Sequence, residues 1–355
     1  VPDLLRLGRQ ENGLPGQFTK ANQARFQPAF EQWRQNPIAQ LSEHDITERI
    51  ESILPLFEEA TYFNILSHLS LAIRQALWKV DLATLDSSQN PEVRALDDLK
   101  QMAVQLRFSI GEALPSQLPD LGLRTSQNTT PDNSAELFAA LSEHQEGNHV
   151  FDQLDRFLEQ YGYLSEVATD IAVPTWRESP QPVRELFTQF LLNSTEGSPA
   201  KGSNVAPTPQ PGVEKNKKSA GWKTRQVQAR LNLKGQVAEV YDRLLAVLRA
   251  CFVELESRWL SEAWLEAQGD IFFLTWPEIQ QQLSQPQPVN ELRLKIHVAK
   301  HQWNRQRTQR VPYLVYGQPT QLDSPEPDAL SPMASGTLQG IGASAGKVEG
   351  TVQVL

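Results

Sequence analysis

The sequence predicts a mainly α-helical protein, a multi-helix central domain with a long disordered insertion, followed by the first β-strands of an α/β domain. Apolar residues recur at three- and four-residue spacing through most of the first 310 residues, which is the period of amphipathic helices. Proline- and glycine-rich stretches separate these runs. After residue 337 the period changes to two, as in Thr351-Val352-Gln353-Val354, which is typical of a strand.

Composition narrows the class of protein. A length of 355 residues indicates two or three domains. A net charge of −9 argues against a generally basic nucleic-acid coat. The single cysteine, Cys251, excludes an internal disulfide framework and a multi-cysteine zinc site, and it fits a reducing, cytoplasmic compartment. No apolar run approaches the roughly 20 residues of a membrane helix, so we expect no membrane contact.

Residues 1–193 are expected to form the first helical region. Within it, we expect the glycines and prolines of residues 1–40 to break any long helix. Ser42 and Asp45 then form a capping box for a helix that Pro55 kinks or splits. Pro91 begins the next helix, and a later one ends near Tyr161-Gly162. Residues 173–182 contain three prolines and are expected to form a loop.

The second half of the chain is also expected to be mainly helical up to residue 316. Residues 194–221 have almost nothing to bury and are expected to be a disordered insertion. The helical region resumes over 222–316, with its strongest helix over about 224–265 and its last over about 289–310. Residues 271–274 are expected to be a strand or a buried turn. Residues 317–336 are a predicted linker, and 337–355 begin the β-containing domain.

Several residues of chemical interest have ordinary structural explanations. His297 and His301 lie one helical turn apart, but cationic neighbours favour a solvated face over a metal site. His144 and His149 fit a polar helix connection better than a metal site. Cys251 lies on the apolar stripe of the strongest helix and is expected to pack there. The basic stretches 213–234 and 290–310 leave a nucleic-acid adaptor as the weakest alternative.

Three segments, in the right order, resemble one family. The last is the glycine-rich run Leu338–Val352, which resembles the opening of the swivelling phosphohistidine domain of phosphoenolpyruvate-utilising enzymes. Gly269–Ile279 is similar to the segment that precedes this domain in the phosphoenolpyruvate synthase-like and rifampicin phosphotransferase-like branch. The central-domain signature of that branch is similar to Phe157–Gly162, Asp170-Ile171 and Trp176–Pro180.

The resemblance implies a phosphotransferase in which an N-terminal ATP-grasp domain phosphorylates a histidine of the swivelling domain. This chain would then be a piece of that enzyme, with the ATP-grasp domain before Val1 and the carrier histidine after Leu355. ATP and Mg²⁺ would bind elsewhere in the parent enzyme, so we expect no cofactor, no metal, no catalytic residue and no independent activity in this chain. The resemblance implies a small-molecule acceptor, whose binding we assign to Tyr161, Gly162, Asp170, Trp176 and Arg177.

The signature departs from the branch pattern where a basic pair, a glutamate and an arginine are common. Those positions hold Tyr163 and Leu164, Ala168, and Thr175. The loss of these charges leaves an alternative open, in which the helical region is a catalytically degenerate ligand-binding or interaction module. A purely structural alternative also stays open, in which Trp176 packs and Arg177 pairs with Asp170 or Glu178.

Overall fold

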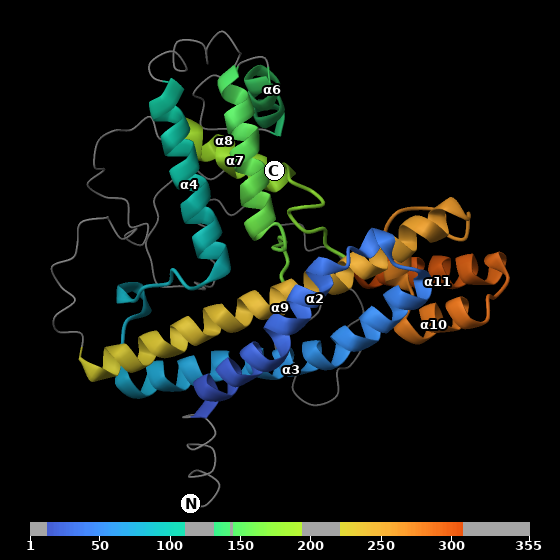
Figure 1. Cartoon of the computed structure of the whole chain (residues 1–355), viewed down its shortest axis with the longest axis horizontal. Helices are drawn as coiled ribbons and strands as arrows, with labels where there is room; N and C mark the ends of the chain where they lie inside the picture. The colour runs from blue at the N-terminus through green and yellow to red at the C-terminus, as the bar shows by residue number, and fades with distance from the viewer. Residues whose placement is uncertain (1–12, 111–130, 143–144, 194–220, 308–355) are drawn as a thin grey trace, which may run out of the picture. The chain divides into compact units, whose positions relative to one another are not determined.

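The computed structural model describes residues 13–110, 131–142, 145–193 and 221–307, and these are mainly helical (Figure 1). The prediction of a mainly helical fold is confirmed. Within these ranges the only β-type pairing is an isolated antiparallel bridge between Ser165 and Thr175. None of the described helices is both long enough and apolar enough to cross a membrane. Most of the predicted 194–221 insertion, the 317–336 linker and the 337–355 strands lie outside the described residues.

The chain divides into two compact units. The first contains residues 1–200 and 209–257, and the second contains residues 201–208 and 258–355. The functional residues discussed below belong to the first unit.

The N-terminal segment is helical, contrary to the expectation that its glycines and prolines would break it. Residues 13–21 are helical and continue through a π-helical turn, η1 (Asn22–Phe26), into α2 (Gln27–Gln35). Pro28 follows the π-helical turn directly, as the second residue of α2, so the continuous helix accommodates a residue that lacks a backbone N–H. Phe18 and Phe26 are almost fully buried, so tertiary packing outweighs the weak helix propensity of this segment.

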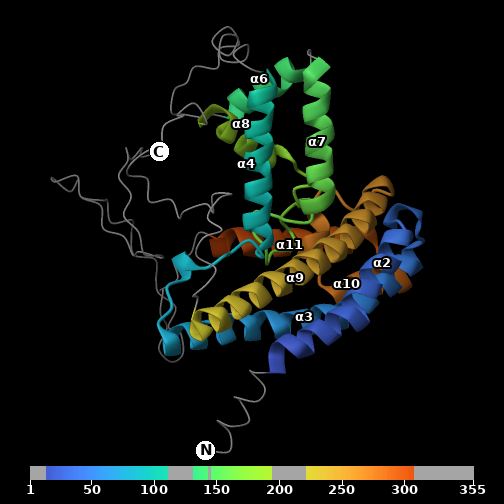
Figure 2. The same cartoon turned by 60° about the vertical axis from the view of Figure 1, so that its left-hand side comes forward.

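The helix α3 (Glu43–Trp78) begins at the predicted capping box. The Ser42 N–H donates to Asp45 Oδ2 at 3.1 Å, and the Asp45 N–H donates to Ser42 Oγ at 3.2 Å. Pro55 lies inside this helix and does not split it. The helices α2, α3 and α9 (Trp222–Ser261) run side by side in both views (Figures 1 and 2), and the Phe57 ring lies 4.8 Å from that of Tyr241.

Four further helices of the first unit share an apolar core. They are α4 (Pro91–Ile110), α6 (Pro131–Ser142), α7 (Gln145–Tyr161) and α8 (Gln181–Asn193). The predicted start at Pro91 and the predicted end at Tyr161 are confirmed. Leu99, Leu137, Phe157 and Phe187 are central members of this core.

The helix α9 contacts both α3 and the segment that leads into α4. Its predicted apolar stripe is buried at Val237, Val240, Leu244, Leu248, Cys251 and Leu255. At Gly235, an added Cβ would lie 2.3 Å from the carbonyl oxygen of Gln89, so α9 passes directly against the segment that leads into α4. Arg94 of α4 donates to Glu239 of α9 at 2.5 Å. These contacts fix the start of α4 on α9.

The second unit is described over residues 258–307. Residues predicted as a strand or buried turn form a 3₁₀ helix, η4 (Asp270–Phe273), so the strand alternative was wrong. A Thr275–Glu278 capping box begins α10 (Trp276–Ser284), and α11 (Val289–Arg307) follows. The basic side chains of α11 contact carboxylates within this unit: Arg293 and His297 contact Glu266, Lys295 contacts Glu278, and Lys300 contacts Asp270.

Candidate functional site

The loop between α7 and α8, residues 162–180, carries four of the five predicted site residues, and it begins at Gly162. The Gly162 N–H donates to the Leu158 carbonyl at 2.8 Å, which ends α7. A Cβ added at Gly162 would lie 2.2 Å from that carbonyl oxygen and 2.9 Å from Cβ of Arg177. Only glycine therefore fits where the outgoing and returning parts of the loop meet.

The loop returns against its own beginning. The Trp176 N–H donates to the Leu164 carbonyl at 2.7 Å, and the Arg177 N–H donates to the Gly162 carbonyl at 3.0 Å. The guanidinium of Arg177 donates to the carbonyls of Leu158 and Glu159 at 3.1 and 3.0 Å. A cation at the C-terminal end of a helix satisfies free carbonyls and interacts favourably with the helix dipole. Arg177 thus caps α7, and its partners are not the Asp170 or Glu178 of the structural alternative.

Two other predicted site residues point into the helical core. The Trp176 ring is 9% exposed and stacks on Phe157, with ring centroids 6.3 Å apart and planes at 18°. Tyr161 is 3% exposed, and its hydroxyl donates to Asp98 of α4. Burial, the hydrogen bond to Asp98 and the charge of Asp98 all raise the pKa of Tyr161 above its ordinary value. Both rings therefore contribute to the packing of α7 against its neighbours.

The second half of the loop is held on α9 by an ion pair. Arg249 Nε donates to Glu178 Oε2 at 2.7 Å, and Arg249 Nη1 donates to the Ile171 carbonyl at 2.6 Å. Glu178 Oε2 also accepts from the N–H and Oγ1 of Thr175, at 2.7 and 3.0 Å. Burial opposes ionisation of Glu178, but the hydrogen bonds from Arg249 and Thr175 outweigh burial and lower the pKa of Glu178.

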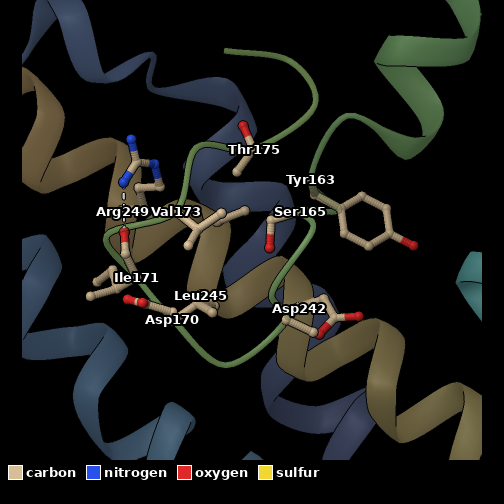
Figure 3. A pocket seen from close by; sticks show the side chains of 11 residues that line it. Tyr163, Ser165, Asp170, Ile171, Val173, Thr175, Asp242, Leu245 and Arg249 are labelled. Atoms are coloured by element: carbon tan, nitrogen blue, oxygen red, sulfur yellow. Dashed lines mark hydrogen bonds between the residues drawn. The ribbon is translucent and has the colours of Figure 1, made fainter. Parts of the chain in front are cut away.

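A small pocket lies between this loop and α9. Figure 3 shows the loop crossing the helix, with Asp242 and Arg249 at opposite ends of the pocket. The space it encloses is about 10 Å³, which is room for about one water molecule. The lining residues are Tyr163, Ser165, Ala168, Asp170, Ile171, Val173 and Thr175 from the loop, and Asp242, Leu245, Ala246 and Arg249 from α9.

The pocket gathers three of the four positions at which the sequence departs from the branch pattern, while the fourth, Leu164, is buried in the helical core. Tyr163, Ala168 and Thr175 all line it, and so does Asp170. Asp170 is exposed, and its Oδ1 accepts from the Ala172 N–H at 2.9 Å. Of the five predicted site residues, only Asp170 lines the pocket, whereas Tyr161, Gly162, Trp176 and Arg177 shape the loop around it.

Asp242 is the most unusual group in the pocket. Its side chain belongs to a residue that is 6% exposed, and Oδ2 is buried with no hydrogen-bond partner among the described residues. Burial, followed by the charges of Glu92 and Glu239, raises the pKa of Asp242 to about 7. A carboxyl group in this state exchanges a proton near neutral pH, and such groups cluster at functional sites.

Sequence reasoning missed both Asp242 and Arg249, although one signal was available. The two residues are seven positions apart on α9, which places them on one face of the helix beside its apolar stripe. Oppositely charged residues on a face that also carries Leu245 and Ala246 indicate a partly buried polar site rather than a solvated surface.

The other chemical candidates do not form a site in the described part of the chain. No group of three or more metal-ligating side chains occurs there. His297 contacts Glu266 at 3.1 Å, and His149 contacts Gln153 at 2.9 Å, while His144 lies outside the described ranges. Cys251 is buried, and burial raises the pKa of its thiol to about 12, which favours the packing role predicted for it.

The comparison that bears on function covers this loop, this pocket and the part of α9 that lines it. Residues 119–255 match the family model of the rifampicin phosphotransferase fourth domain. The resemblance to the rifampicin phosphotransferase-like branch is therefore confirmed over this segment, which contains α6, α7, α8 and most of α9. No curated protein and no solved structure matches the chain. The segment that matches the fourth-domain family contains every residue that lines the pocket.

Proposed function

We propose that the helical region of this chain is the acceptor-binding and spacer part of an ATP-dependent phosphotransferase that carries the phosphoryl group on a histidine. The observation that supports this proposal most is the match of residues 119–255 to the rifampicin phosphotransferase fourth domain. The ATP-grasp domain and the carrier histidine would belong to other parts of the same enzyme. ATP and Mg²⁺ would bind there, where phosphoryl transfer needs cationic groups around the phosphates.

The geometry fits a supporting role better than a catalytic one. The guanidinium of Arg177 caps α7 and that of Arg249 is paired with Glu178, so both of these cations are already engaged by the protein. The pocket beside them contains the carboxyl groups of Asp170 and Asp242, and its cation, Arg249, already contacts Glu178. We therefore infer that this region positions an acceptor and that the phosphoryl group arrives from another domain.

The second candidate function is a ligand-binding module that no longer takes part in phosphoryl transfer. It is favoured by the uncharged residues Tyr163, Ala168 and Thr175, which all line the pocket where the branch commonly has charged side chains. The two functions differ in whether the complete protein forms a phosphohistidine.

The test is to incubate the complete protein encoded by the gene with ATP that is labelled at either of its two outer phosphates. A phosphohistidine is labile in acid and stable in base, so we expect label with this behaviour on the complete protein. Residues 1–355 alone serve as the control and should take up no label. If the complete protein folds and binds ATP but is not labelled, the transferase proposal is wrong and the ligand-binding module is favoured.

A further inference from the structure

One side of α3 presents large apolar side chains to solvent. Of the twelve large apolar side chains that are exposed in the described part of the chain, six lie on this helix. Five of these six recur at three- and four-residue spacing, which places them on one face: Tyr62, Ile65, Leu69, Ile73 and Leu77. They are between 43% and 70% exposed, and we call them the α3 stripe. Apolar side chains gathered in this way are typical of an interaction surface.

The α3 stripe is separate from the face through which α3 packs within the first unit. On that packed face, the centroid of the Phe63 ring lies 5.4 Å from that of Phe18, and Arg74 donates to Gln226 of α9 at 3.1 Å. Leu71, which lies between Phe63 and Arg74 in the sequence, is buried. The contacts of α3 with its neighbours therefore leave the α3 stripe exposed among the described residues.

The α3 stripe is nearly symmetric about Leu69. Ile65 and Ile73 lie four residues before and after it, and Tyr62 and Leu77 lie seven residues before and eight residues after it. When two copies of a helix pack antiparallel about a two-fold axis, residues at equal distances from the axis lie opposite each other. With the axis at Leu69, Ile65 of one copy faces Ile73 of the other, and Tyr62 faces Leu77. Each apolar side chain of the α3 stripe then covers another.

The charges that flank the α3 stripe follow the same symmetry. Glu58 lies eleven residues before Leu69, Lys79 lies ten residues after it, and both are exposed. Antiparallel pairing about Leu69 brings Glu58 of each copy close to Lys79 of the other, whereas parallel pairing sets like charges side by side. Exposed ion pairs add little energy, so these charges determine the orientation and the apolar side chains supply most of the attraction. A second copy of the chain therefore complements this face in both shape and charge.

We propose that the α3 stripe is a self-association surface, on which two copies of the chain pack antiparallel through α3 about a two-fold axis at Leu69. The stripe from Tyr62 to Leu77 is about 22 Å long at the helical rise of roughly 1.5 Å per residue. A contact of this length is small for a protein–protein interface, so we expect a weak dimer that forms reversibly. This inference concerns self-association alone and holds whether or not the complete protein transfers phosphate.

The first experiment is sedimentation velocity on the 355-residue chain over a range of concentrations. We expect a reversible change from monomer to dimer, with a dissociation constant on the order of 10 μM. Leu69→Lys places two like charges at the axis, so this variant should remain monomeric over the same range. Leu294→Lys is the matched control, because Leu294 lies on α11 and is 64% exposed, against 53% for Leu69. The control should dimerise as the wild type does.

The second experiment tests the orientation of the two copies by cross-linking. The only cysteine of the chain, Cys251, is buried, so cysteines introduced on the surface are the reactive ones. Chains with Tyr62→Cys are mixed with chains with Leu77→Cys and oxidised mildly. In the antiparallel arrangement the two positions face each other, so the mixture should form disulfide-linked dimers far faster than either variant alone. In a parallel arrangement each variant would instead cross-link with itself.

Three results would overturn the proposal. A wild-type chain that stays monomeric up to about 200 μM does not self-associate, and the α3 stripe would then be assigned to a contact with another partner. Dimerisation of Leu69→Lys as strong as that of the wild type would place the contact elsewhere on the molecule. Self-cross-linking of Tyr62→Cys that is as fast as cross-linking in the mixture would exclude the antiparallel arrangement. The first result needs only wild-type protein, so it decides the question even where a variant fails to fold.

Discussion

Arg249 of α9 and Glu178 of the α7–α8 loop form an ion pair, with Arg249 Nε 2.7 Å from Glu178 Oε2. The arginine side chain is 9% exposed and the glutamate side chain 31% exposed, so water screens the pair only in part. The same guanidinium donates to the Ile171 carbonyl. Arg249 thus holds the loop on α9 at two points, Glu178 and the Ile171 carbonyl. The loop itself contains prolines and forms no helix.

The ion pair predicts a loss of stability when Arg249 is replaced. Arg249→Met keeps the apolar stem but removes the cation that pairs with Glu178 and the donor to the Ile171 carbonyl, so Glu178 keeps only its hydrogen bonds from Thr175. The free energy of unfolding should fall by about 2–4 kcal/mol, measured by chemical denaturation. Arg225→Met, at an exposed position of the same helix, should change it by less than about 0.5 kcal/mol. Equal effects of the two substitutions would show that the ion pair does not hold the loop.

Glu178 gives the protein an acid-dependent contribution to stability. Its pKa is lowered in the folded state, so the folded protein binds this proton less readily than the unfolded chain does. The stabilisation from Glu178 is complete above the ordinary glutamate pKa of about 4.3 and is lost as the pH falls through the lowered pKa of the folded state. Glu178→Gln should flatten the fall in unfolding free energy over this acidic range. An unchanged pH profile in the variant would contradict the assignment.

Asp242 has the opposite effect on stability. Its raised pKa keeps the proton on the folded state between about pH 4 and about pH 7, where the unfolded chain has lost it. The contribution of Asp242 therefore decreases as the pH rises through this window, and the full penalty applies above about pH 7. Asp242→Asn should raise the unfolding free energy by about 2–4 kcal/mol near pH 8, with little change near pH 4. Destabilisation near pH 8 would show that the carboxylate has a partner.

Gly162 is predicted to tolerate no side chain. Gly162→Ala would place a Cβ 2.2 Å from the Leu158 carbonyl oxygen, so α7 or the loop would have to move. We expect a loss of about 2–4 kcal/mol in the free energy of unfolding. Gly16→Ala is the matched control, because nothing lies within 4 Å of the added atom and the residue is helical. That substitution should stabilise by about 0.5–1 kcal/mol. A neutral Gly162→Ala would contradict the close approach.

Much of the fold was predictable because local signals and packing agree. The Ser42–Asp45 capping box, the start at Pro91 and the stop at Tyr161 each depend on a few adjacent residues, and each is present. The helix over residues 13–35 was not predicted, because burial of Phe18 and Phe26 overrides the glycines and prolines between which they lie. The helix propensities of neighbouring residues do not indicate which side chains tertiary packing will bury, so they could not predict the burial of Phe18 and Phe26.

The pocket was harder to predict than the loop. The signature residues of the loop were visible in the sequence, and the resemblance pointed to Asp170, Trp176 and Arg177. What those side chains contact depends on helices that are distant in the sequence: Trp176 packs within the α4, α7 and α8 core, and Glu178 contacts Arg249 on α9. Asp242 lies 72 positions after Asp170 in the chain and shares a pocket with it only because α9 passes beneath the loop.

Hydrogen–deuterium exchange of the loop amides tests most directly whether the signature residues build a fixed platform on α9. The Trp176 and Arg177 amides donate to the Leu164 and Gly162 carbonyls, so they should exchange far more slowly than the amides of an unstructured chain. Arg249→Met should speed their exchange by about tenfold or more, while the amides in the middle of α3 keep their protection. Fast exchange at Trp176 and Arg177 in the wild type, or no change in the variant, would contradict a loop fixed by the Arg249–Glu178 pair.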